Sequence, residues 1–209
     1  HPSIILWGVR INESQDDEEF YKRTNKIAHH YDPTRPTGGT KAGEKMQTFE
    51  DVYAYNDFIH NGTNVFLKPI DQVLKTDHPY LITEFMGHMY PTKANDTPER
   101  LINHAVRYAS ILNQYQGIDR ISGGFGWALV DYYTHKEFGS GDHICYHGIY
   151  DNFRLPKPAA KVYESQEATK PYLEFLNSMD IGDFDAGFVD AMHIASNAEK
   201  IELYQDQRF

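Results

Sequence analysis

Short apolar segments alternate with longer polar segments from His1 to about Gln166, and this alternation constrains the fold more than any other feature of the chain. Short apolar segments bounded by turn residues are typical of strands, and polar segments with a helical period are typical of helices. Their alternation predicts an α/β fold made of βα units around a parallel sheet. The predicted strands are residues 4–9, 36–40, 51–55, 80–84 and 121–129.

Two long helices are predicted between these strands. For the first, Ser14 is the expected N-cap, Asp17 stands at the third helical position, and the helix ends before the Asp32-Pro33 pair. The second is expected to open at Thr97-Pro98 and to end before Gly117, since proline favours the start of a helix and glycine its end.

The two ends of the chain look unlike the ends of a complete domain. Residues 4–7 are apolar and rich in isoleucine, which predicts a strand buried on both faces. Residues 186–197 and 199–207 read as two strands of a β-sandwich whose other strands are absent. We therefore expect a fragment with three parts: half of a barrel in residues 1–169, a linker in 170–187, and the start of an immunoglobulin-like sandwich in 188–209.

Composition excludes several classes of partner. The formal net charge is -10, and an acidic surface repels phosphate backbones and anionic lipids, so neither nucleic acid nor membrane is an expected partner. Cys145 is the only cysteine, which excludes an intrachain disulfide. No set of cysteines and histidines has the spacing of a zinc site, so no metal ligands are assigned.

Two glutamates stand at the ends of predicted strands. Glu13 follows the first strand and Glu84 ends the fourth. Parallel α/β barrels build their active sites at the carboxyl ends of their strands, and hydrolysis of a glycosidic bond with retention needs two carboxyl groups roughly 5 Å apart. Spacing alone leaves structural roles open, with Glu13 in a helix cap and Glu84 in an ion pair at a strand end.

Several motifs, in order along nearly the whole chain, resemble glycoside hydrolase family 2 of the β-galactosidase type. HPSIILWGVRINES resembles the fourth barrel strand of that family, which ends in an Asn-Glu pair, and DPTRP resembles the turn into the fifth. PYLITEF resembles the seventh strand and GGFGWALVDY the eighth. The matching residues are 1–14, 32–36, 79–85, 123–132, 146–165 and, for the following sandwich, 196–204.

The resemblance implies a partial (β/α)₈ TIM barrel, strands four to eight, and gives its residues roles. Glu13 would be the acid/base and Glu84 the nucleophile of a retaining double displacement. Asn12 would bind the 2-hydroxyl of the sugar, and Trp127 would form the floor of the sugar site with its ring exposed.

The chain departs from the family at two places. Many members carry a tyrosine near the end of strand six that touches the nucleophile, where this chain has Asp57 and Phe58. A histidine three residues after the nucleophile is common in the lactose-cleaving branch, whereas here Gly87 stands there and His88 follows. We take Asp57 and His88 as further candidate substrate-binding residues, and these departures leave the sugar specificity open.

Two other charged residues lie at predicted strand ends. Arg10 and Asp131 are expected either to orient the glutamates or to form ordinary ion pairs.

The predicted substrate is a β-linked oligosaccharide or glycoside, and the predicted enzyme is a β-galactosidase that needs no organic cofactor. The alternatives are a sister activity (β-glucuronidase, β-mannosidase or algal galactan cleavage) and a non-catalytic carbohydrate-binding fragment. A divalent cation in the intact enzyme, a homo-oligomer, and a cytoplasmic or secreted bacterial location all remain open. The isolated fragment is expected to be inactive.

Overall fold

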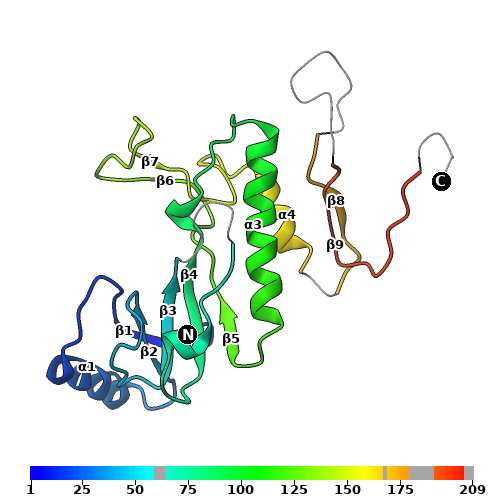
Figure 1. Cartoon of the computed structure of the whole chain (residues 1–209). Helices are drawn as coiled ribbons and strands as arrows, with labels where there is room; N and C mark the ends of the chain where they lie inside the picture. Colours follow the sequence, from blue (N-terminus) through cyan, green and yellow to red (C-terminus); the bar gives the residue numbers. More distant parts are fainter. Residues whose placement is uncertain (59–64, 167–168, 179–190, 205–209) are drawn as a thin grey trace. The chain divides into compact units, whose positions relative to one another are not determined.

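The computed structural model describes residues 1–58, 65–166, 169–178 and 191–204, and these form two compact units (Figure 1). Unit 1 comprises residues 1–89 and 110–127, and unit 2 comprises residues 90–109 and 128–209. Helix α3 (Pro98–Gln116) contributes its first part to unit 2 and its last part to unit 1. It opens at the expected Thr97-Pro98 step and is followed by Gly117, as predicted.

Unit 1 is built on a five-stranded parallel sheet in which each strand pairs with the next one along the chain. This arrangement confirms the predicted α/β fold with a parallel sheet. The elements of the unit are β1 (Trp7–Arg10), α1 (Glu18–Tyr31), β2 (Thr37–Lys41), β3 (Val52–Asp57), α2 (Ile70–Val73), β4 (Tyr80–Phe85), the 3₁₀ turn η1 (Gly87–Met89) and β5 (Ile121–Gly124).

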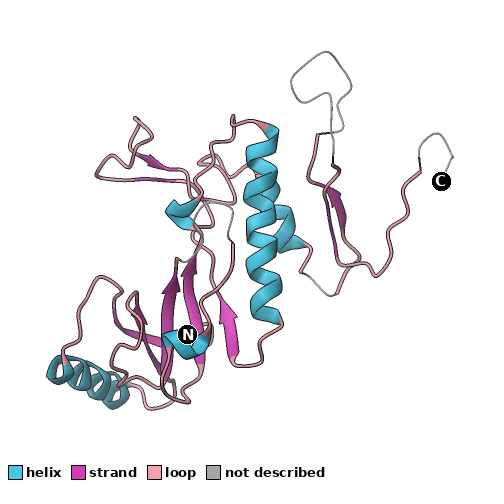
Figure 2. Ribbon diagram, in the orientation of Figure 1, coloured by secondary structure: helices cyan, strands magenta, loops and turns pink. Residues whose placement is uncertain are grey.

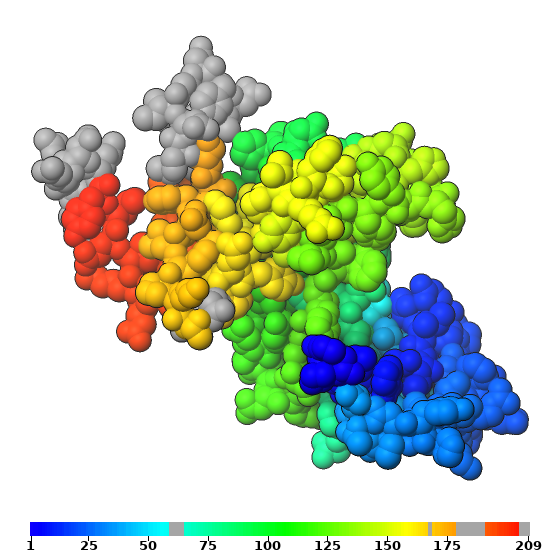
Figure 3. All heavy atoms as spheres, turned by 180° about the vertical axis from the view of Figure 1, so that it is seen from behind, coloured from blue at the N-terminus to red at the C-terminus, as the bar shows by residue number. Residues whose placement is uncertain are grey.

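The first strand differs from the prediction. It begins at Trp7 rather than at residue 4, and Ile4 and Ile5 are 37% and 73% exposed (Figure 3, dark blue). The expected burial on both faces is wrong for the described residues, because residues 4 and 5 precede β1 and are left uncovered by the rest of the described chain. The fifth strand is also shorter than predicted, since β5 ends at Gly124.

The first helix uses a different cap from the one expected. The Asp17 side chain accepts the backbone N–H of Phe20 at 2.9 Å, so Asp17 is the N-cap of α1. The Ser14 hydroxyl instead donates to the carbonyl of Ile11 at 2.6 Å and closes the turn after β1. Serine and aspartate are both good N-cap residues, and Asp17 takes the position because it directly precedes Glu18, the first residue of the helix.

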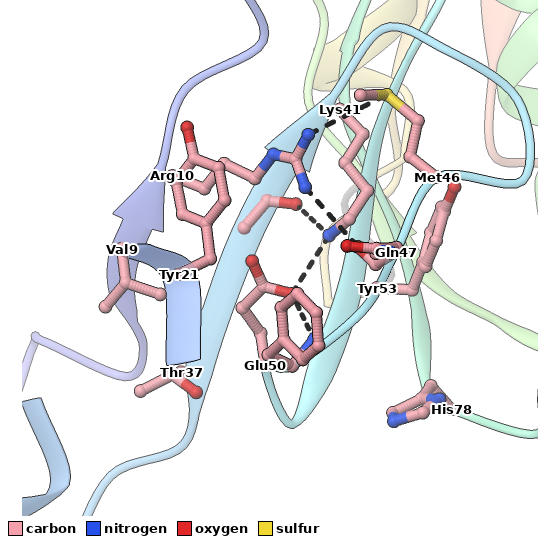
Figure 4. Close-up of polar contacts among 12 residues, drawn as sticks. Val9, Arg10, Tyr21, Thr37, Lys41, Met46, Gln47, Glu50, Tyr53 and His78 are labelled. Atoms are coloured by element: carbon pink, nitrogen blue, oxygen red, sulfur yellow. Dashed lines mark hydrogen bonds and ion pairs between the residues drawn. The ribbon is translucent and has the colours of Figure 1, made fainter. Parts of the chain in front are cut away.

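The connection from β2 to β3 is a loop without a helix, which leaves room for a buried ion pair (Figures 2 and 4). Lys41 Nζ donates to Glu50 Oε2 at 3.1 Å and to the carbonyl of Gly39 at 2.8 Å. Both charged side chains are fully buried, and the Lys41 ammonium lies 4.7 Å from the centre of the Tyr53 ring. Each partner therefore compensates the buried charge of the other in the loop where other βα units place a helix.

Arg10 holds the turn that carries Glu13. Its guanidinium forms an ion pair with Asp16 at 2.9 Å, donates to the carbonyl of Gln47 at 3.3 Å, and lies 4.5 Å from the centre of the Tyr21 ring. Of the two roles left open by the sequence, the structure gives Arg10 the ordinary ion pair.

Unit 2 contains the other elements: β6 (Tyr132–Tyr133), β7 (Ile144–Cys145), α4 (Pro158–Glu164), β8 (Leu173–Phe175) and β9 (Ile194–Ser196). Asp131 forms a buried ion pair with Lys157 at 2.8 Å, so it too takes the structural role. In both units, the described helices include none long and apolar enough to cross a bilayer.

The end of the chain follows the prediction only in part. Strand β9 falls within the expected sandwich strand 186–197, but its antiparallel partner β8 lies inside the segment 170–187 that was expected to be a linker. Residues 199–204 form no strand, contrary to prediction, whereas 186–190 and 205–207 lie outside the described residues. The domain boundaries at 169 and 187 stay predictions.

Candidate active site

The carboxyl ends of β3 and β4 bring together the polar side chains of the candidate site. Asn56 on β3 pairs in register with Glu84 on β4, just after a register shift in the ladder. The Asn56 amide donates to Glu84 Oε2 at 2.8 Å, and the Thr83 hydroxyl donates to Asn56 Oδ1 at 2.9 Å. Glu84 is half-buried and Asn56 is 2% exposed.

Glu13 lies in the turn after β1 and is exposed, next to the half-buried Asn12. Its carboxylate is near enough to act electrostatically on Glu84. Burial raises the pKa of the Glu84 carboxyl above its ordinary value, the negative charge of Glu13 raises it further, and the hydrogen bond from Asn56 opposes both. The fold thus couples two carboxyl groups that are 71 residues apart in the sequence.

Trp127 is fixed beside the end of β4 by its backbone. Its N–H donates to the carbonyl of Phe85 at 2.9 Å, and its carbonyl accepts the N–H of Gly87 at 2.8 Å. The chain makes this turn with two residues in the left-handed region, Met86 at φ 69° and Gly87 at φ 50°. Trp127 is 42% exposed, so it is not wholly buried, and its role as the floor of a sugar site stays a prediction.

Gly87 keeps the space between the indole and the carboxylate open. A side chain there would meet Trp127 Cδ1 at 3.4 Å and Glu84 Oε1 at 3.8 Å. The Trp127 side chain and the Glu84 carboxylate therefore border the same small volume. An aromatic face beside a carboxylate suits a sugar, because the apolar C–H face of a pyranose packs on the ring while its reactive carbon approaches the oxygen.

The two remaining candidates differ in accessibility. His88 is exposed in η1, and its ring lies 5.0 Å from that of Phe58. Asp57 is fully buried, and its Oδ2 accepts the backbone N–H of Lys68 at 2.9 Å. The role of Asp57 and of His88 as substrate-binding residues stays a prediction.

Three residues of the site were missed by the sequence analysis: Asn56, Thr83 and Gly87. Asn56 could have been found, because a parallel register places the end of the third predicted strand directly beside the end of the fourth. Thr83 and Gly87 carried no such signal. Tyr55, which precedes Asn56 on β3, is 2% exposed.

No group of three or more metal-ligating side chains occurs in the portions of the chain that the structure describes.

A parallel sheet with two carboxyl groups near the carboxyl ends of its strands is the arrangement on which α/β barrels build their active sites. Residues 1–170 match the model of the glycosyl hydrolases family 2 TIM barrel domain, and the chain belongs to that family.

Curated relatives agree with this assignment. The chain is 52% identical over 207 residues to a β-galactosidase of Thermoanaerobacterium thermosulfurigenes, covering 97% of this chain and 29% of the relative. It is 46% identical to a β-galactosidase of Thermoanaerobacter pseudethanolicus, covering 100% of this chain and 28% of the relative. The chain thus spans less than a third of the length of these relatives.

Solved structures support the fold. A β-galacturonidase from Eisenbergiella tayi bound to galacturonate superposes with a TM-score of 0.64 at 23% identity, over 78% of this chain and 33% of that one. A β-D-glucuronidase of Dictyoglomus thermophilum gives a TM-score of 0.66 at 18% identity, over 82% of this chain and 33% of that one.

Proposed function

We propose that the chain carries the reacting groups of a retaining β-glycosidase of the β-galactosidase type, with Glu84 as nucleophile and Glu13 as acid/base. The observation that carries the proposal is the electrostatic coupling of Glu13 to Glu84 at the carboxyl edge of the sheet. A retaining glycosidase needs two carboxyl groups in such proximity. The expected separation of roughly 5 Å between them stays a prediction.

The proposed reaction has two displacements. An oxygen of ionised Glu84 attacks the anomeric carbon, and the bond to the leaving oxygen breaks while protonated Glu13 gives that oxygen its proton. Glu13, now a carboxylate, removes a proton from water, and the resulting hydroxyl releases the sugar from Glu84. Asn12 would bind the 2-hydroxyl and Trp127 the apolar face of the sugar, with His88 at the exposed rim.

The order of protonation places a demand on the site. In the described chain burial acts on Glu84 and raises its pKa, whereas Glu13 is exposed. The first step needs Glu84 ionised and Glu13 protonated.

The substrate proposed is a β-galactoside, since the two relatives described above are named β-galactosidases. β-Glucuronide and β-mannoside cleavage are the competing activities within the family.

The experiment uses the longest natural polypeptide that contains this chain, called the parent below. The parent is incubated with a fluorinated dinitrophenyl β-galactoside, which traps a glycosyl-enzyme, and the labelled peptide is located by mass spectrometry. Label on Glu84 is expected, together with a loss of turnover of about 10⁴-fold or more in Glu84→Gln. Glu13→Gln should lose about 10²- to 10⁴-fold.

If the Glu84→Gln variant turned over substrate at nearly the rate of the parent, the proposal would be wrong and a carbohydrate-binding role would be favoured. Assays on aryl β-galactoside, β-glucuronide and β-mannoside decide the sugar.

Residues 1–209 alone should hydrolyse glycosides feebly. Within the described residues β1 and β5 each pair on one side only, and Glu13 is exposed to water that screens the charges of the transition state. Turnover of the isolated chain within about tenfold of the parent would contradict this expectation.

A further inference from the structure

We propose that Asn56 is a positioning residue for Glu84, which holds one carboxylate oxygen and thereby makes Oε1 the attacking oxygen. The inference rests on the proposed function, because it concerns how the same carboxylate is presented to the sugar. Asn56 touches Glu84 rather than the reacting atoms, so it acts through its neighbour.

The position of Asn56 is fixed by the sheet. It stands on β3 directly beside Glu84 on β4, and its side chain is 2% exposed. Its amide nitrogen lies 2.8 Å from Glu84 Oε2, which is a normal length for a hydrogen bond to a carboxylate. Asn56 is buried, so turning its amide away from Glu84 would break this hydrogen bond and leave a buried NH₂ group without a partner.

Thr83 fixes which way the Asn56 amide points. An ionised carboxylate only accepts hydrogen bonds, so the NH₂ end of the amide must face Glu84 and the carbonyl end must face away. The carbonyl end accepts the Thr83 hydroxyl at 2.9 Å. Thr83 and Glu84 are neighbours on β4, so a single strand holds both ends of the amide.

The second oxygen of Glu84 is on the side of the sugar. Oε1 borders the volume that Gly87 leaves open beside the Trp127 ring, whereas Oε2 is bound to Asn56. A hydrogen bond to Oε2 engages its lone pair and lowers its nucleophilicity. The bond to the anomeric carbon is therefore formed by Oε1, while the leaving oxygen departs with its electron pair and takes the proton of Glu13.

The hydrogen bond also has an electrostatic role. Burial and the charge of Glu13 both raise the pKa of Glu84, and Asn56 is the contact that opposes them. The other ionisable neighbours are directed elsewhere: Asp57 accepts from the Lys68 backbone, and the His88 ring packs on Phe58. Strand β5 carries no ionisable side chain. Asn56 thus favours the ionised form that the nucleophile needs.

The test compares three isosteric substitutions in the parent. Asn56→Asp replaces the amide donor by a carboxylate of the same shape, and Thr83→Val removes the hydroxyl that orients the amide. Asn113→Asp is the matched control, because it adds the same charge on an exposed face of α3. The readouts are the pH profile of kcat/KM on nitrophenyl β-galactoside and the site of fluoroglycoside labelling.

Asn56→Asp should lower kcat/KM about 10²-fold and move the acid limb upward by about one pH unit or more, because Glu84 then ionises at higher pH. Thr83→Val should shift the limb in the same direction by less, and Asn113→Asp should leave it unchanged. Thr83→Val keeps the test available if Asn56→Asp fails to fold.

Unchanged acid limbs in folded Asn56→Asp or Thr83→Val would overturn the positioning role while label on Glu84 still supported the nucleophile. Label on a residue other than Glu84 would instead overturn the proposed function itself.

Discussion

Two carboxylates of unit 1, Glu50 and Glu84, are held in opposite ways. Glu50 is fully buried and its Oε2 is paired with the Lys41 ammonium, whereas Glu84 is half-buried and receives an amide hydrogen bond from Asn56. The charge acting on Glu84 comes from Glu13 and has the same sign. Glu50 is thus neutralised by its neighbour, whereas the carboxylate proposed as the nucleophile has no opposite charge beside it among the causes that shift its pKa.

The strongest test of this comparison is Lys41→Met. The substitution leaves the Glu50 charge buried without its cation, and Glu50 Oε1 already has no hydrogen-bond partner among the described residues. We expect the free energy of unfolding to fall by about 3–5 kcal/mol. Urea unfolding followed by tryptophan fluorescence measures it, since Trp7 and Trp127 both lie in unit 1.

Lys22→Met is the control for Lys41→Met, because Lys22 pairs with Glu18 on the exposed face of α1 and such pairs contribute less than about 1 kcal/mol. The double variant Lys41→Met with Glu50→Leu should recover most of the loss. A single variant no less stable than the control would show that buried Glu50 does not need the Lys41 charge.

A smaller effect is expected at Gly39, which makes room for the buried pair. A methyl group at this position would lie 2.0 Å from Glu50 Oε1 and 2.5 Å from Glu50 Cδ, so Gly39→Ala must displace the Glu50 carboxylate from Lys41. We expect a loss of about 1–3 kcal/mol in the free energy of unfolding. Gly8→Ala on β1 is the matched control, since a methyl group there meets nothing within 4 Å.

Equal stability of Gly39→Ala and Gly8→Ala would show that the loop carrying Glu50 shifts to accommodate the added methyl group at little cost in free energy. The ion pair would then be an adjustable contact rather than a fixed part of the fold.

The sequence predicted β3 and β4 because their β-branched and aromatic runs are local signals of a strand, whereas β2 has no such run. Glu13 and Glu84 were placed at strand ends by the same local reading, but their proximity was not a local signal, because β1 and β4 are separated by two strands in the sheet. The Lys41–Glu50 pair could not be predicted, because no local pattern shows that the β2–β3 connection lacks a helix. Ser14 and Asp17 are equally good caps by residue type, so the choice between them depended on the backbone of the turn.

The exposure of residues 4–5 shows another limit of sequence patterns. An apolar run predicts burial, yet burial also requires other segments that cover the run, and in the described chain none covers residues 4 and 5.

The smallest expected effect is a gain in stability from Glu84→Gln. The pKa of Glu84 in the folded chain is raised above its ordinary value of 4.5 by burial and by Glu13, so the folded state binds this proton more tightly than the unfolded state does. Stability from this group is therefore fully present below the ordinary value and is lost as pH rises through the raised value.

Glutamine cannot ionise, so Glu84→Gln avoids that loss. At a pH well above the raised pKa of Glu84, the variant should be slightly more stable than the unsubstituted chain, and at or below pH 4.5 the two should be equally stable. The measurement is urea unfolding at both pH values, with the exposed Glu19→Gln as the control for a change of one charge. The expected gain is smaller than the loss in Lys41→Met because Glu84 is only half-buried. A loss at high pH larger than that of the control would mean that ionised Glu84 stabilises the fold as Glu50 does, and the contrast between the two carboxylates would fail.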